Sequence, residues 1–102
     1  SLRTMKSSAF LINTARGQLV NEEDLYQALC DGAIAGAGLD VFHQEPLLES
    51  KLFELDNIVV TPHLAGHTNE AEARMAELAI QNTLDVLAGN ECRHIVNRDS
   101  LK

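Results

Sequence analysis

Three short apolar runs alternate with helix-type segments, and this alternation limits the chain to few folds. The runs span residues 9–12, 33–42 and 57–61 and contain few polar residues. Runs of this kind are typical of strands that are buried on both faces of a parallel sheet. Because strands that alternate with helices form parallel sheets with right-handed crossovers, the sequence predicts an α/β fold.

The segment between the first two runs carries the signals of a short helix. Asn21 is a favourable N-cap, and acidic residues follow it in the first turn. Leu25, Ala28 and Leu29 share one face of such a helix, and Gly32 is a suitable residue to end it. We expect a helix of about ten residues here.

The longest periodic segment covers residues 69–88. Asn69 and Glu72 resemble a capping box, and Gly89 provides a C-terminal stop. Apolar residues lie on two stripes of this helix, which predicts burial on more than one side. In an isolated chain such a helix would expose an apolar face, so we expect the chain to form homo-oligomers through it.

Charge and composition exclude several classes of partner. The 102-residue chain has a net charge of −7 and no cluster of lysine and arginine, so nucleic acid and anionic membranes are poor partners. No apolar run approaches the length that spans a membrane. Cys30 and Cys92 have no metal-type spacing, so we expect no metal site and two reduced thiols in a cytoplasmic protein.

Four polar side chains follow the apolar runs and are candidates for a functional site: Arg16, Asp40, Glu45 and His63. In parallel α/β sheets, ligands bind beyond the C-terminal ends of the strands, which is where these residues fall. A guanidinium can hold a carboxylate through two parallel hydrogen bonds, and an imidazole can transfer a proton near neutral pH. A carboxylate beside that imidazole would keep it charged and able to donate. Taken singly, each residue also fits an ordinary role in a surface ion pair, a loop or a solvated turn.

The motifs around these residues, in their order and spacing, resemble one family. The matching segments are residues 5–6, 11–17, 38–42, 45–46 and 57–66. From about residue 5 to residue 97, the chain resembles the C-terminal part of the NAD-binding domain of the D-isomer-specific 2-hydroxyacid dehydrogenases.

The resemblance implies an enzyme that reversibly reduces a 2-keto acid to a 2-hydroxy acid with NADH or NADPH. By position, Arg16 resembles the substrate-binding arginine, His63 the acid–base histidine and Glu45 the glutamate that supports it. These three are the expected catalytic residues, while Asp40 is expected to contact the nicotinamide carboxamide. Glyoxylate, hydroxypyruvate and phosphoglycerate-type substrates all stay open. The residues that the resemblance assigns to cofactor binding are Thr14, Ala15, Arg16, Asp40, His63, Ala65 and Gly66.

The chain also departs from the pattern of this family. It contains no GxGxxG fingerprint for the cofactor pyrophosphate. We therefore expect a fragment in which residues 1–88 form the C-terminal half of a Rossmann-type domain, with a connector helix at 69–88. Residues 89–102 would lead back toward an absent substrate domain. Such a fragment would contact only the nicotinamide half of NAD or NADP and would be inactive alone.

A second function stays open at this point. Some members of this family act as NAD-responsive protein-interaction modules of the corepressor type. They keep the same arginine, glutamate and histidine, so these residues alone do not separate the two functions.

Overall fold

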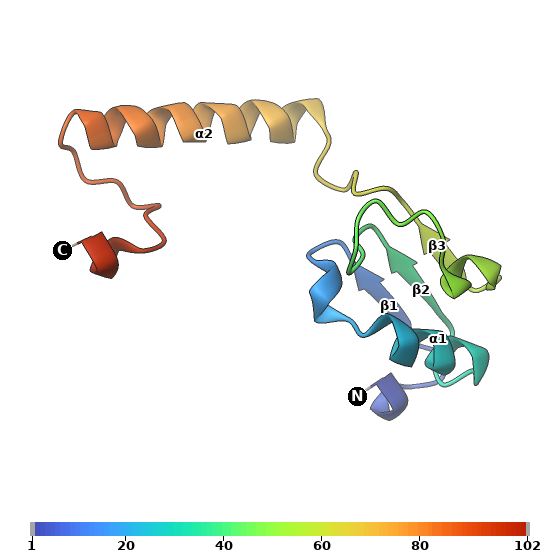
Figure 1. Cartoon of the computed structure of the whole chain (residues 1–102). Helices are drawn as coiled ribbons and strands as arrows, with labels where there is room; N and C mark the ends of the chain where they lie inside the picture. The colour runs from blue at the N-terminus through green and yellow to red at the C-terminus, as the bar shows by residue number, and fades with distance from the viewer. Residues whose placement is uncertain (1, 102) are drawn as a thin grey trace. The chain divides into compact units, whose positions relative to one another are not determined.

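A computed structural model describes residues 2–101 of the chain, which divide into two compact units. The first unit ends at Ala65 and the second begins at Gly66. Figure 1 shows that the strands belong to the first unit and the longest helix to the second.

The first unit is built on a three-stranded parallel sheet (Figure 1). Its strands are β1 (Phe10–Asn13), β2 (Gly36–Leu39) and β3 (Ile58–Val60), hydrogen-bonded in the order β1-β2-β3. The predicted parallel α/β sheet is confirmed, and its strands end along one edge. β2 is shorter than the apolar run at 33–42, because the flanking residues form the turn before the strand and the loop after it.

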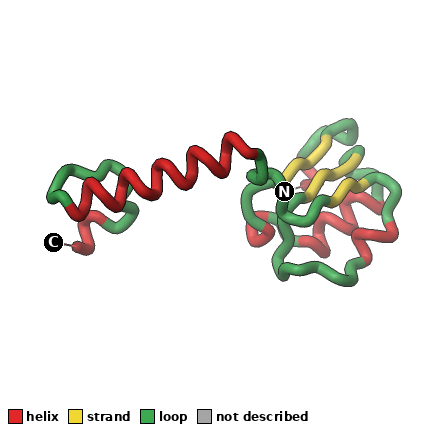
Figure 2. Tube along the Cα trace, turned by 90° about the horizontal axis from the view of Figure 1, so that it is seen from above, coloured by secondary structure: helices red, strands yellow, loops and turns green. Residues whose placement is uncertain are grey.

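Helix α1 (Glu22–Cys30) connects β1 to β2 and covers one face of the sheet (Figure 2). The Asn21 side chain accepts a hydrogen bond from the Asp24 N–H at 3.0 Å, and Gly32 follows the helix with a φ of +65°. Both predicted end signals are therefore confirmed. The core between α1 and the sheet consists of Leu25, Ala28, Leu29, Ile34, Ala37, Leu39, Phe42 and Leu52. Short 3₁₀ turns lie at η1 (Leu2–Thr4), η2 (Gly17–Leu19) and η3 (Lys51–Glu54).

The opposite face of the sheet is exposed. Phe10, Ile12 and Val59 have exposed fractions of 67%, 69% and 69%. A Cβ at Gly36 would lie 2.9 Å from the Phe10 ring, so this glycine makes room for a side chain of the neighbouring strand. The prediction that both faces are buried is wrong for the residues described. The reason is that α1 packs on one side only, while the connection from β2 to β3 contains just the 3₁₀ turn η3.

The second unit consists of helix α2 (Asn69–Leu87) and a tail with the 3₁₀ turn η4 (Arg98–Leu101). The N-cap of α2 is Thr68, whose hydroxyl accepts a hydrogen bond from the third amide of the helix at 3.1 Å. The expected cap at Asn69 is therefore wrong by one residue, while Gly89, with a φ of +73°, ends the helix as predicted. Within the described part of the chain, no residue of α2 is buried. The predicted burial of α2 on more than one side is therefore wrong for the residues described, since both apolar stripes are exposed.

Among residues 2–101, no helix is both long enough and apolar enough to span a membrane.

Candidate functional site

His63 follows strand β3 and has an unusual backbone conformation. Its φ is +56°, in the left-handed region that residues other than glycine seldom occupy. Its backbone N–H donates to the carbonyl of Asp40 at 2.8 Å, which ties the turn to the end of β2. Backbone of this kind persists only where its surroundings hold it, and it is frequent at functional sites.

Asp40 is a buried carboxylate, 4% exposed, that faces the same turn. Its Oδ1 accepts hydrogen bonds from the Thr61 hydroxyl at 2.5 Å and from the Leu64 N–H at 2.8 Å. Its Oδ2 accepts from the Ala65 N–H at 2.9 Å. The Thr61 hydrogen bond is the largest of the contacts that lower the pKa of Asp40, and the two backbone N–H groups add to it. Asp40 is therefore ionised at neutral pH.

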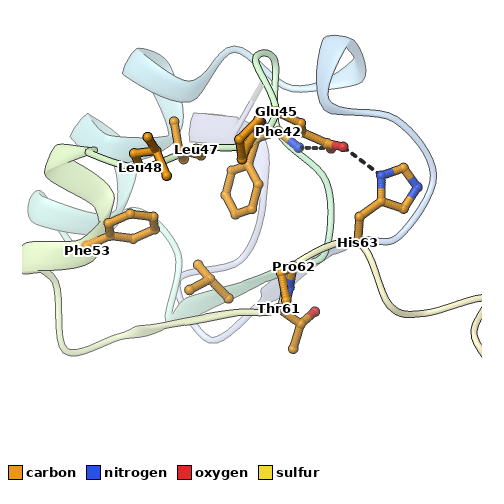
Figure 3. Close-up of a pocket in the computed structure, with 10 residues that line it drawn as sticks. Phe42, Glu45, Leu47, Leu48, Phe53, Thr61, Pro62 and His63 are labelled. Atoms are coloured by element: carbon orange, nitrogen blue, oxygen red, sulfur yellow. Dashed lines mark hydrogen bonds and ion pairs between the residues drawn. The ribbon is translucent and has the colours of Figure 1, made fainter.

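Glu45 and His63 form a hydrogen-bonded pair (Figure 3). The distance from Glu45 Oε2 to His63 Nδ1 is 2.7 Å, and Oε1 accepts from the Phe42 N–H at 2.9 Å. The hydrogen bond with His63 lowers the pKa of Glu45, and the Phe42 N–H lowers it further. Because Nδ1 is occupied by the carboxylate, Nε2 is the ring nitrogen left to exchange a proton with a reactant. The His63 side chain is 50% exposed, so such a reactant can reach it.

Arg16 lies in the turn that follows β1. The buried Asn13 side chain holds this turn, since it accepts from the Ala15 N–H at 3.1 Å and donates to the Arg16 carbonyl at 2.9 Å. The Arg16 guanidinium is exposed and donates to the carbonyl of Ala15 at 2.6 Å. Among the side chains that the structure describes (residues 2–98 and 100), no carboxylate forms an ion pair with Arg16. A guanidinium without an acidic partner is available for a ligand carboxylate.

A cavity of about 190 Å³ brings the three predicted catalytic side chains together. It lies between the turn after β1, the loop after β2 and the end of β3. The residues that line it are Arg16, Gly17, Gln18, Phe42, His43, Glu45 and His63. A cation that can bind a carboxylate thus shares a hollow with a pair that can move a proton, which suits a small anionic carbonyl compound.

A larger apolar cavity of about 600 Å³ is also lined by Glu45 and His63 (Figure 3). The rings of Phe42 and Phe53 meet edge to face there, with centroids 6.5 Å apart, and Leu47 and Leu48 lie beside them. In Figure 3 the imidazole of His63 points away from these side chains.

Sequence reasoning missed this apolar cavity, the turn-holding Asn13 and the contacts that Asp40 makes with residues 61–65. The only signal for Asn13 was an Asn at a strand end, which is typical of a side chain that bonds its own backbone. The apolar cavity had no signal, because Leu47 and Leu48 resemble any apolar loop residues until η3 folds against them.

The predicted cofactor residues lie in the turns at the ends of β1, β2 and β3. Thr14 and Ala15 are exposed after β1, Ala65 is exposed after β3, and Gly66 begins the second unit. The N–H groups of Ala15 and Ala65 are bound by protein side chains. Thr14, Ala15 and Ala65 are uncharged and exposed, which suits contact with a flat nicotinamide ring. Among the described residues, no cluster of His, Cys, Asp or Glu could hold a metal ion.

Comparison with known proteins agrees with this architecture. Residues 1–65 match the family model for the NAD binding domain of D-isomer specific 2-hydroxyacid dehydrogenases. The chain is 53% identical over 102 residues to a glyoxylate reductase of Thermofilum pendens, a match that covers 99% of this chain and 30% of the relative. It is 47% identical over 102 residues to glyoxylate/hydroxypyruvate reductase B of Yersinia enterocolitica, covering 99% and 31%. The chain therefore spans about 30% of the length of these relatives.

The fold is also similar to that of a solved structure, an NADPH-dependent glyoxylate/hydroxypyruvate reductase from Sinorhizobium meliloti in complex with NADP and malonate. The TM-score is 0.81 at 35% sequence identity, and the match covers 90% of this chain and 29% of that one.

Proposed function

Because this chain belongs to the family of D-isomer specific 2-hydroxyacid dehydrogenases, we propose that it supplies the acid–base half of a site that reduces 2-keto acids with NADH or NADPH. The observation that carries this proposal is the Glu45–His63 pair, 2.7 Å apart, in one cavity with Arg16. Arg16 can bind the carboxylate of a 2-keto acid while His63 donates a proton to its keto oxygen.

The reaction follows from the chemistry of these three side chains. Arg16 holds the substrate carboxylate through paired hydrogen bonds and so orients the keto group. Reduced nicotinamide, when bound, supplies the hydride that the keto carbon accepts. His63 donates the Nε2 proton to the keto oxygen, and the Glu45 carboxylate stabilises the imidazolium before the transfer. In the reverse direction, His63 takes the proton from the 2-hydroxy group.

We assign the nicotinamide half of the cofactor to the turns at the strand ends. Thr14, Ala15, Arg16, Asp40, His63 and Ala65 would contribute to it, and Gly66 follows Ala65 directly in the sequence. The sequence contains no GxGxxG, the glycine-rich motif that places a cofactor pyrophosphate at a helix N-terminus. We therefore expect no turnover from the 102-residue chain alone.

For the substrate we propose the smallest members of the class, glyoxylate and hydroxypyruvate. The names of the relatives support this choice. The 190 Å³ cavity around Arg16, Glu45 and His63 has room for either of these keto acids.

A hybrid enzyme tests the proposed function directly. In this hybrid reductase, the 102-residue sequence replaces the aligned segment of the Thermofilum pendens glyoxylate reductase. We expect oxidation of NADH or NADPH that depends on glyoxylate, and His63→Gln should lower kcat by at least about 10²-fold.

His67 offers a matched control, because its Nδ1 also lies near a glutamate, Glu72 Oε1, at 3.2 Å, but in the second unit. His67→Gln should leave the rate of the hybrid within about twofold. A folded hybrid that reduces neither keto acid, or that keeps its rate after His63→Gln, would sink the proposal.

We propose also that copies of the protein associate through α2. The exposed fractions of Met75 and Ile80, on its two stripes, are 59% and 62%, and contiguous apolar surface of this kind usually marks an interface. Sedimentation of the chain at increasing concentration should show association, and Met75→Glu combined with Ile80→Glu should abolish it. A concentration-independent monomer would contradict this assignment.

The free cysteines Cys30 and Cys92 support a reducing compartment, so we place the protein in the cytoplasm.

A further inference from the structure

Asp40 forms hydrogen bonds with residues on both sides of His63 in the sequence. Its carboxylate accepts one hydrogen bond from Thr61, before His63, and two from Leu64 and Ala65, after it. Its backbone carbonyl accepts the N–H of His63. Asp40, at the end of β2, thus accepts four hydrogen bonds from the turn that follows β3.

The turn needs such a partner for two reasons. His63 has a φ of +56°, which is costly for a residue with a side chain and persists only when neighbours hold it. The N–H groups of Leu64 and Ala65 also point to the two oxygens of one carboxylate, and neighbouring backbone N–H groups of this kind favour an anion. A buried carboxylate satisfies both requirements, because it presents several acceptor positions to three donors at once.

The position of the turn decides where the imidazole lies. The Glu45–His63 contact is a single hydrogen bond of 2.7 Å, and His63 has no other side-chain partner among the described residues. A shift of about 1 Å in the backbone of His63 would take Nδ1 out of hydrogen-bond range of Glu45.

We propose that Asp40 is a positioning residue, whose carboxylate fixes the turn of residues 61–65 and so aims His63 at Glu45. This role adds to the proposed function, because it makes the acid–base histidine dependent on a residue that does not touch the reacting atoms. It also differs from the expected contact with the nicotinamide, since it operates without any cofactor.

The test is made on the full 102-residue chain with no cofactor present. Asp40→Asn keeps the size of the side chain but replaces one acceptor oxygen with an NH₂ group, which would face a backbone N–H of the turn. We expect amide hydrogen exchange at Leu64 and Ala65 to become at least about tenfold faster, because this turn then opens locally. The ¹⁵N resonance of His63 Nδ1 should also move toward that of a solvated imidazole, while the resonances of His67 stay in place.

Two further variants sharpen the measurement. Asp56→Asn removes the same charge from an exposed aspartate next to η3, and it should change exchange at Leu64 and Ala65 by less than about twofold. Thr61→Val removes one of the three donors to the carboxylate, so it should give a smaller effect than Asp40→Asn at both positions.

A folded Asp40→Asn chain with unchanged exchange at Leu64 and Ala65 and an unchanged His63 resonance would overturn the proposal. If Asp40→Asn prevents folding, Thr61→Val replaces it in the test. An unchanged His63 resonance in the Thr61→Val chain would then overturn the proposal.

In the hybrid reductase, Asp40→Asn should lower kcat by about tenfold or more while the KM for glyoxylate changes little, because Arg16 still binds the carboxylate. The NMR readout does not depend on turnover. An inactive hybrid with a correctly placed His63 would therefore count against the proposed function and not against this role of Asp40.

Discussion

Replacing Gly17 with alanine should separate the arginine of the site from its acid–base pair. Gly17 follows Arg16 and packs on the backbone of the loop that carries Glu45. A Cβ at Gly17 would lie 1.9 Å from the carbonyl carbon of Phe42 and 2.4 Å from the backbone nitrogen of His43. Because both atoms belong to the backbone, no change of side-chain rotamer can relieve the contact.

The peptide of His43 has little freedom to move away. Its N–H donates to the Glu22 carboxylate at 2.7 Å, and its carbonyl accepts from the Gln18 side chain at 3.4 Å. The side chains of Gln18 and Glu22 therefore hold His43, in the loop that carries Glu45, close to Gly17. A Cβ at Gly17 would push this loop away, and these two hydrogen bonds resist that movement.

The geometry sets the size of the effect. Real Cβ atoms almost never come closer than 3.0 Å to another heavy atom, so one of the two segments must move by at least about 1 Å. Overpacking of this kind typically costs about 1–3 kcal/mol of folding free energy. A displacement of about 1 Å between Arg16 and the Glu45–His63 pair can also lower kcat/KM by about 10²-fold.

Urea unfolding of the chain and turnover of the hybrid reductase measure the two parts of this prediction. Gly66→Ala is the control for stability, because a Cβ at Gly66 meets nothing within 4 Å among the described atoms and its φ lies outside the left-handed region. We expect Gly17→Ala to lose about 1–3 kcal/mol and Gly66→Ala to stay within about 0.5 kcal/mol of the parent chain. A Gly17→Ala chain as stable as the parent, with an unchanged kcat/KM in the hybrid, would refute this reasoning.

Three further changes have expected outcomes. Leu25→Ala empties a fully buried position between α1 and the sheet, so urea unfolding should report a loss of about 2–5 kcal/mol. Asp40 and Glu45 have lowered pKa values in the folded state, so they stabilise it above their unfolded pKa values of about 4. That contribution is lost as the pH falls through the folded values, and urea midpoints at pH 7, 5 and 3 should decline less in an Asp40→Asn chain. Thr68→Ala removes the observed cap of α2 and should cost about 0.5–2 kcal/mol of helix stability by circular dichroism, whereas Asn69→Ala should cost less. Equal losses from the two cap variants would contradict the assignment of Thr68.

Local signals in the sequence predicted α1 well. Its N-cap, its apolar face and its terminal glycine all depend on residues three or four positions apart, so neighbouring residues contain the information. The cap of α2 shows the limit of such signals. Thr68 and Asn69 both have capping side chains, and the choice between them depends on the path by which the preceding loop enters the helix.

Periodicity identified apolar surfaces without identifying what covers them. The runs at 9–12 and 57–61 are apolar on both faces, yet only the face toward α1 is buried in the residues described. The stripes of α2 are apolar and exposed. The hydrophobic pattern shows which side chains favour burial. It does not show which surface covers them, because that surface can come from residues distant in the sequence.

The sequence by itself determined the parallel α/β sheet and the edge at which Arg16, Glu45 and His63 meet, because parallel strands that alternate with a helix bring their C-terminal ends to one side. Only the tertiary structure decided which atoms pair. Glu45 and His63 are 18 residues apart, and Asp40 and Leu64 are 24 apart, so their contacts depend on the pairing of β2 with β3 and on the close packing at Gly17. A hydrogen bond tolerates errors of only a few tenths of an ångström. Sequence pattern places whole elements, and it cannot place their side chains that closely.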